Sequence, residues 1–232
     1  MIRTIAFDAD DTLWHNERLF HETQEAFREL LRPYHDDASI NDRMLAAEQR
    51  NLQHFGYGIK GFVLSLIETA VELTEGRISG TEIQQVIELG KGMLQHPVVP
   101  LPNVEEVLGQ LNEDYELVLI TKGDLFDQEA KLARSGLGRF FSKIEIVSEK
   151  QEATYRSILR RHGINPDHFL MVGNSVKSDI LPVVALGARA VHIPYEVTWE
   201  HERVEGAEPG THGYTRLDSI SELPEFLGMT AS

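Results

Sequence analysis

Cysteine is missing from the sequence. None of the 232 residues is a cysteine, which excludes disulfides, thiolate catalysis and zinc sites with cysteine ligands. The ten histidines form no HxH or HExxH pattern, so a histidine-ligated metal is not expected. Basic residues are also few, since 22 lysines and arginines stand against 37 acidic residues and the formal net charge is -15. General binding to nucleic acid depends on clustered positive charge and is therefore not expected.

Long apolar runs are missing too. No stretch approaches the roughly 20 apolar residues that a membrane-spanning helix needs, and the N-terminus enters a strand-like segment without a signal-peptide pattern. We therefore expect a cytoplasmic protein that does not bind membranes. Hydrophobic residues make up 41% and charged residues 25%, which is typical of a folded globular chain. The length suits one core with room for a second, smaller module.

Helical and strand patterns divide the chain into two kinds of segment. Residues 16–95 carry apolar positions at helical spacing, broken by turn residues, and predict four helices. Residues 2–7 form an apolar strand that stops at Asp8, and from residue 96 onward strand-like and helix-like segments alternate. Alternation of this kind predicts an α/β fold with a parallel sheet. We expect a core of residues 1–15 and 96–232, with residues 16–95 inserted as a helical domain.

The expected elements of the core are short. Its strands should cover residues 2–7, 117–120, 144–147, 169–172, 190–193 and 214–216. Its helices should cover residues 104–111, 125–134, 153–161 and 178–186, with a further short helix near Leu223.

Two aspartates follow the first expected strand, at the edge where ligands bind in a sheet of this kind. Asp8 and Asp10 stand two residues apart, so one carboxylate can act as a nucleophile while the other transfers protons. A carboxylate attacks a phosphate dianion poorly unless a divalent cation and positive side chains neutralise the charge. The pair therefore predicts a phosphate site with a metal ion.

Later segments supply the remaining groups. Thr121, Lys122 and Gly123 follow the next core strand and offer a hydroxyl and accessible backbone amides for phosphate oxygens. Lys150 can add a fixed positive charge, and Asp179 is the best remaining metal ligand. Each segment also has an ordinary interpretation, as a turn, a helix cap or a solvated lysine. Their order along the chain favours the functional interpretation.

In this order the segments resemble the haloacid dehalogenase superfamily. Its phosphatase members have a strand-end DxDx[TV] motif, a later Ser or Thr, a Lys and a terminal acidic motif. The resemblance covers residues 1–14 and about 97–193, and the DxDxT element within FDADDTL is its most specific part. It implies a Rossmann-like parallel sheet with strand order 3-2-1-4-5. It also implies that residues 16–95 form a helical cap, which closes over the site and selects the leaving group.

The resemblance further implies roles for individual residues. Asp8 would form an aspartyl-phosphate, and Asp10 would protonate the leaving group and then activate water. Thr121 and Lys150 would bind the transferring phosphoryl group.

A magnesium site is implied in the same way. Mg²⁺ would be held by the Asp8 carboxylate, the Asp10 main-chain carbonyl and Asp179. The sequence departs from the family pattern at Asn174, where phosphatases commonly have Asp. Asn174 would then accept a hydrogen bond from a water on the metal, and the site would carry one negative charge less.

Further substrate-binding candidates are Lys122, Gly123 and Lys60. Residues 57–62 combine two glycines with an aromatic residue and Lys60, which suits a substrate-facing loop; the alternative is a turn between helices with a surface lysine. Trp199 is interpreted as the hydrophobic anchor of a loop. His201, between Glu200 and Glu202, comes nearest to a histidine metal pattern but is not expected to be functional. The acidic residues between positions 196 and 208 are interpreted as solvated surface.

The function predicted from these residues is a Mg²⁺-dependent phosphatase that acts on a small phosphorylated metabolite. A 2-haloacid dehalogenase is the nearest alternative; Asn174 slightly favours it, but Asp10 would then have no alkoxide to protonate. A phosphonatase usually lacks the second aspartate, whereas a phosphomutase would return the phosphoryl group to a sugar. A non-catalytic protein that binds a phosphorylated ligand is the alternative outside enzymes. An exposed apolar face of the helical domain would permit a homodimer.

Overall fold

The computed structural model describes residues 1–197, 202 and 213–229. The chain folds as two compact units. The first, here called the core unit, consists of Met1–Glu17, Val98–Lys122 and Gln128–Ser232. The second, here called the helical unit, consists of Arg18–Pro97 and Gly123–Asp127.

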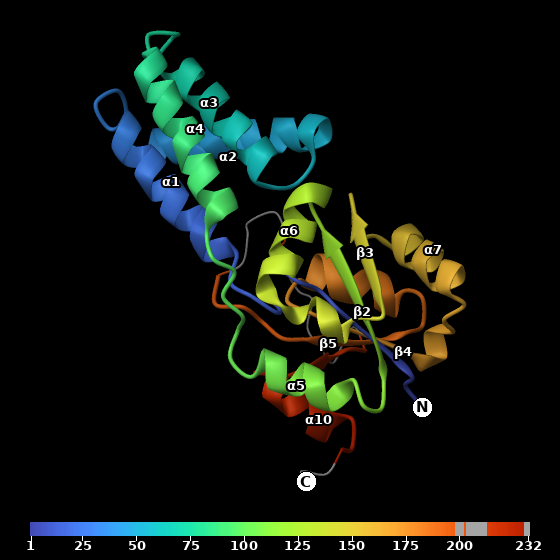
Figure 1. Ribbon diagram of the computed structural model, residues 1–232. Coiled ribbons are helices and arrows are strands. Elements are labelled where there is room, and N and C mark those ends of the chain that lie inside the picture. The colour runs from blue at the N-terminus through green and yellow to red at the C-terminus, as the bar shows by residue number, and fades with distance from the viewer. Residues whose placement is uncertain (198–201, 203–212, 230–232) are drawn as a thin grey trace. The chain divides into compact units, whose positions relative to one another are not determined.

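The core unit is built on a six-stranded parallel sheet (Figure 1). The strand order is β3-β2-β1-β4-β5-β6, which confirms the expected parallel sheet and its order and adds β6 at one edge. Phe7 at the end of β1 is paired with Leu119 on one side and Val172 on the other, so Asp8 leaves the sheet at its centre. The strands are β1 (Thr4–Phe7), β2 (Glu116–Lys122), β3 (Lys143–Val147), β4 (Phe169–Gly173), β5 (Arg189–His192) and β6 (Thr215–Arg216).

Helices cover both faces of this sheet (Figure 1). Successive strand residues point to opposite faces, so Ile5 and Phe7 pack in one apolar cluster and Ala6 in another. The first cluster includes side chains of α5 (Val104–Leu111), α6 (Leu125–Ser135) and α10 (Leu223–Phe226); the second includes side chains of α7 (Glu152–His162) and α8 (Leu181–Val184). Burial on both faces explains why the central strands are mostly apolar.

One expected helix of the core is interrupted. Instead of a single helix over residues 178–186, a π-helical turn at Val176–Ile180 is followed by α8. Pro182 lies in the first turn of α8, where its missing N–H leaves no helical bond unmade. Short 3-10 turns occupy Leu137–Phe140, Pro166–His168 and Ile220–Glu222.

The helical unit has its own apolar core. Its four helices are α1 (Glu17–Leu31), α2 (Asp37–Phe55), α3 (Ile59–Leu73) and α4 (Gly80–Gln95), and α1 begins at the last residue of the adjoining core segment. Phe27, Leu66 and Val86 are fully buried between them. Ser79 and Glu82 form a capping box that starts α4. In the part of the chain that the structure describes, no helix has the length and apolar character needed to cross a membrane.

Candidate active site

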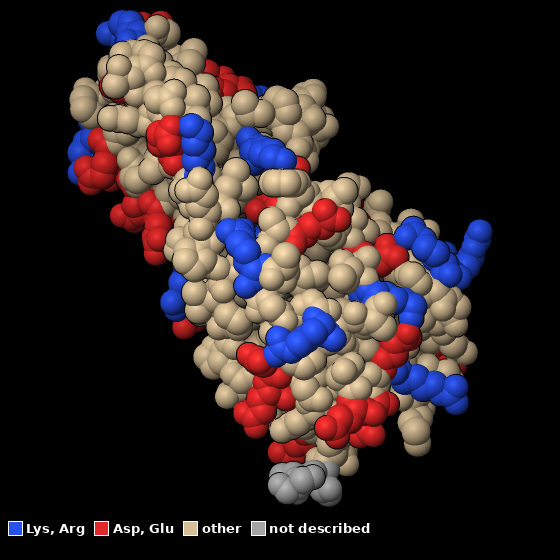
Figure 2. Space-filling view, in the orientation of Figure 1, with Lys and Arg blue, Asp and Glu red and all other residues tan. Residues whose placement is uncertain are grey.

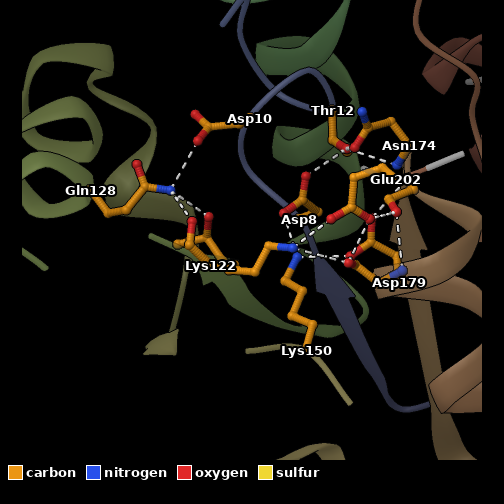
Figure 3. A network of polar contacts seen from close by, with 12 residues as sticks. Asp8, Asp10, Thr12, Lys122, Gln128, Lys150, Asn174, Asp179 and Glu202 are labelled. Carbon is orange, nitrogen blue, oxygen red and sulfur yellow. Dashed lines mark hydrogen bonds and ion pairs between the residues drawn. The ribbon is translucent and has the colours of Figure 1, made fainter. Parts of the chain in front are cut away.

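Asp8 and Asp179 share one ammonium group in the core unit (Figure 3). Asp8 follows the central strand β1, Lys150 precedes α7, and Asp179 lies in the π-helical turn after β4. Lys150 Nζ donates to Asp8 Oδ1 and, at 2.7 Å, to Asp179 Oδ1. All three side chains are buried. Three residues predicted separately from the sequence are thus in direct contact.

The pKa values in this cluster are shifted by burial and by the mutual interactions of two carboxylates and one ammonium group. Burial raises the pKa of Asp8 to about 7; Lys150 opposes this shift and the charge of Asp179 adds to it. Burial also acts to lower the pKa of Lys150, but the charges of Asp179 and Asp8 outweigh it, so the pKa lies above its ordinary value. With both carboxylates ionised, one negative charge remains uncompensated in a buried site. Such a site favours the binding of a cation.

The Asp10 carboxylate extends toward Gln128, whereas that of Asp8 extends toward Lys150 (Figure 3). Three side chains donate to Asp10. Trp14 Nε1 lies 2.7 Å from Oδ1, and Gln128 Nε2 lies 3.0 Å from Oδ2. Lys131 Nζ bonds to both oxygens, at 2.7 and 2.8 Å. These three donors therefore hold the Asp10 carboxyl group in a defined position.

The last two residues of β2 supply a buried hydroxyl and a cation. Thr121 Oγ1 accepts a hydrogen bond from Gln128 Nε2 at 2.7 Å. Lys122 Nζ lies 3.2 Å from Ser178 Oγ. Gly123 has a φ of 145°, a conformation that residues with a side chain rarely adopt. Gly123 belongs to the helical unit.

Thr12 connects Asp8 with Asn174. Its Oγ1 lies 3.1 Å from Asp8 Oδ2 and 3.3 Å from Asn174 Oδ1, and it accepts a hydrogen bond from the Asn174 backbone N–H at 3.1 Å. Asp179 is held in turn by the backbone N–H of Ser175, 3.0 Å from Oδ2. Asn174, the residue that departs from the family pattern, is thus connected to Asp8 through hydrogen bonds of a single residue, Thr12.

Three sequence-based interpretations concern other parts of the chain. Lys60 lies in the helical unit, where Nζ pairs with Asp124 Oδ1 at 2.9 Å and lies 5.3 Å from the centroid of the Phe126 ring. Its role in substrate binding stays a prediction. Trp199 and His201 lie outside the described residues.

The interpretation of the acidic residues at positions 196–208 as solvated surface is wrong for Glu202. Its carboxylate accepts hydrogen bonds from Lys122 Nζ at 2.5 Å, from Ser178 Oγ at 2.6 Å and from Ser175 Oγ. Burial acts to raise the pKa of Glu202, but these partners outweigh it and hold the pKa below its ordinary value. A carboxylate from a distant segment is therefore hydrogen-bonded to the last residue of β2 and to two serines that follow β4.

Sequence reasoning also missed Gln128 and Lys131. They stand three residues apart on α6, so they project from the same face of the helix. Both are buried, although glutamine and lysine are usually exposed. A polar pair one turn apart, on a helix that follows a strand end, was the available signal.

The oxygen donors of the site fit magnesium. In the described ranges of the chain, no three His, Cys, Asp or Glu side chains are grouped as metal ligands. Magnesium, however, commonly binds only one or two carboxylates and keeps several waters. The buried carboxylates of Asp8 and Asp179, both within bonding distance of Lys150 Nζ, provide such a set.

Comparison with known proteins agrees with this geometry. The model of the haloacid dehalogenase-like hydrolases matches residues 2–187. The chain belongs to this family. A solved haloacid dehalogenase-like family hydrolase from Xanthomonas campestris is 40% identical, with a TM-score of 0.87 over 98% of this chain and 91% of that chain.

Two curated relatives of this hydrolase are phosphatases. A glyceraldehyde 3-phosphate phosphatase of Methanothermobacter thermautotrophicus is 34% identical over 134 residues, which are 55% of this chain and 58% of that protein. This match therefore spans little more than half of the relative's length. A pyrimidine 5'-nucleotidase of Escherichia coli is 26% identical over 172 residues, 68% of this chain and 73% of that protein.

Proposed function

We propose that this hydrolase is a Mg²⁺-dependent phosphatase of small phosphate monoesters, with Asp8 as nucleophile and Asp10 as general acid and base. The observation that carries the proposal is the bridge of Lys150 between Asp8 and Asp179 at the centre of the sheet edge. Asp10, two residues after Asp8, supplies the second carboxylate that ester hydrolysis requires. The names of the two curated relatives, a phosphatase and a 5'-nucleotidase, support the same reaction class.

In the first step, an Asp8 oxygen attacks the phosphorus atom and the bond from phosphorus to the ester oxygen breaks. Protonated Asp10 gives its proton to that oxygen, and the alcohol leaves. Lys150 and the Thr121 hydroxyl stabilise the negative charge on the phosphoryl oxygens. The product on the enzyme is an aspartyl-phosphate at Asp8.

In the second step, water attacks the phosphorus atom of the aspartyl-phosphate. The Asp10 carboxylate takes a proton from that water. The bond between phosphorus and the Asp8 oxygen breaks, which releases inorganic phosphate and restores both side chains. Asp10 thus ends the cycle protonated and ready for the next ester.

Magnesium supplies the positive charge that lets a carboxylate approach a phosphate dianion. The Asp8 carboxylate, the Asp10 main-chain carbonyl and the Asp179 carboxylate would hold it, with Asn174 hydrogen-bonded beside them. Because the side chain of Asn174 is neutral, the site carries one negative charge less than it would with an aspartate at this position.

The substrate is proposed to be a small phosphorylated metabolite. The net charge of -15 disfavours polyanionic partners, and on the face shown in Figure 2 the Lys and Arg side chains are interspersed with acidic and uncharged ones. Lys122, Gly123 and Lys60 are proposed to contribute to substrate binding. A cytoplasmic location and a homodimer stay predictions.

The test is release of phosphate from 4-nitrophenyl phosphate with Mg²⁺, with EDTA, and in the variants Asp8→Asn and Asp10→Asn. We expect turnover only with Mg²⁺, loss of turnover in Asp8→Asn, and a decrease of about 100-fold or more in Asp10→Asn. In the last variant hydrolysis of the aspartyl-phosphate lacks its base, and general acid-base catalysis contributes about 10²- to 10⁴-fold. Glu129→Gln, on the exposed side of α6, is the control. Equal rates in wild type and both aspartate variants would contradict the mechanism. Metal-independent release of halide from a 2-haloacid would instead favour the dehalogenase alternative.

A further inference from the structure

The three donors to Asp10 come from two elements of the core unit. Trp14 is fully buried and lies four residues after Asp10. Gln128 and Lys131 come from one turn of α6 and are 3% and 9% exposed. Lys131 Nζ also lies 3.1 Å from Asn16 Oδ1, which restrains the lysine itself. The carboxylate is thus held between the loop after β1 and α6.

Gln128 also connects Asp10 with the hydroxyl proposed to bind the phosphoryl group. Its Nε2 lies 3.0 Å from Asp10 Oδ2, 2.7 Å from Thr121 Oγ1 and 3.0 Å from the Lys122 main-chain oxygen. Because Thr121 Oγ1 accepts this bond, its own hydrogen stays available for a phosphoryl oxygen. One amide nitrogen therefore fixes the distance between the acid-base group and the phosphoryl-binding group.

We propose that Gln128 and Lys131 are positioning residues of the phosphatase reaction, which hold Asp10 at the place where the leaving oxygen departs. The inference rests on the proposed function. It assigns neither residue a contact with the reacting atoms: Lys131 acts through Asp10, and Gln128 acts through Asp10 and Thr121. A displacement of about 1 Å at such a group can cost about 100-fold in rate.

Dependence on the leaving group reveals this role. A leaving group of low basicity, such as 4-nitrophenolate, departs without a proton, whereas phenolate or an alkoxide needs one. The value of kcat/KM reports the steps through departure of the alcohol. A misplaced Asp10 therefore lowers kcat/KM for esters of basic alcohols and spares esters of acidic phenols. A general loss of structure would lower both to the same extent.

The experiment measures kcat/KM with Mg²⁺ for 4-nitrophenyl phosphate, phenyl phosphate and an alkyl phosphate. Variants are Lys131→Met and Gln128→Met, with Lys131→Arg as the conservative replacement and Glu129→Gln as the exposed control on the same helix. For both Met variants we expect a decrease of about 10- to 100-fold with phenyl and alkyl phosphate and of less than about threefold with 4-nitrophenyl phosphate. Lys131→Arg should keep the wild-type dependence on the leaving group.

A second readout separates the two residues. Gln128→Met should also weaken competitive inhibition by inorganic phosphate, because Thr121 loses its donor, whereas Lys131→Met should not. Equal losses for all esters in both Met variants, or no loss, would overturn the inference and leave the proposed function intact. Absence of Mg²⁺-dependent turnover in the wild type would overturn the proposed function and this inference with it.

Discussion

A Cβ atom on Gly173 would lie 2.3 Å from Oδ2 of Asp179. Gly173 ends β4, and the Asp179 carboxylate occupies the space that a side chain would take there. Real Cβ atoms do not approach other atoms so closely, so Gly173→Ala must displace Asp179. We expect a higher Mg²⁺ concentration for half-maximal activity, by about tenfold or more. A Mg²⁺ titration of activity measures it, and an unchanged midpoint would argue against Asp179 as a metal ligand.

The charge at position 174 should set the affinity for magnesium. Asn174→Asp changes few atoms but adds a negative charge close to Thr12 and Asp8. We expect the Mg²⁺ concentration for half-maximal activity to fall by about tenfold. In EDTA the variant should unfold at a lower temperature than the wild type, because the added carboxylate is repelled by its neighbours. Thermal unfolding with and without Mg²⁺ measures this; equal shifts in both buffers would contradict the prediction.

His192 should make the protein less stable in acid. Burial lowers its pKa below the ordinary value of 6.5, although its hydrogen bond to the Asn174 carbonyl oxygen, 3.0 Å from Nε2, opposes the shift. A depressed pKa means that the folded state binds the proton less well than the unfolded state. The contribution of His192 is therefore full above about pH 6.5 and is lost as the pH falls through its folded pKa.

The measurement is the free energy of unfolding of wild type and His192→Gln at about pH 7.5 and pH 5, in metal-free buffer. Burial raises the pKa of Asp8 and of Asp11 to about 7, and raised carboxyl pKa values make stability fall as the pH rises. These contributions are common to both proteins and cancel in the difference between them. The wild type should lose more stability than His192→Gln on acidification. An identical loss in the two proteins would rule out a depressed His192 pKa.

Two glycines of α4 provide a matched pair in the helical unit. A Cβ on Gly90 would lie 2.3 Å from Val63 Cγ2, whereas a Cβ on Gly92 would meet no atom within 4 Å. Gly92→Ala should raise the free energy of unfolding by up to about 1 kcal/mol, because alanine favours the helix. Gly90→Ala gains the same propensity but must displace a stiff β-branched side chain, at a cost of about 1–3 kcal/mol. Chemical denaturation should thus give Gly90→Ala the lower stability; the reverse order would contradict close packing of α3 on α4.

The periodicity of apolar residues was sufficient to locate most elements. It placed the strand before Asp8 and the helix at residues 104–111, because burial of one or both faces leaves a local pattern in the chain. It failed at residues 178–186, where the interruption depends on hydrogen bonds that a pattern of apolar residues does not record. The strand order came from the family resemblance, since periodicity carries no information on which strands are neighbours.

The sequence by itself determined that Asp8 and Asp10 stand at the end of an apolar strand, and that a hydroxyl, a lysine and a further aspartate lie at or after the ends of later strands. Only the tertiary structure decided which other polar side chains meet them. Gln128 and Lys131 reach Asp10, and Glu202 reaches Lys122, because sheet order and the rotation of α6 bring together residues far apart in the chain. Spacing along a chain reports local faces, whereas contacts between distant segments depend on how the whole core packs.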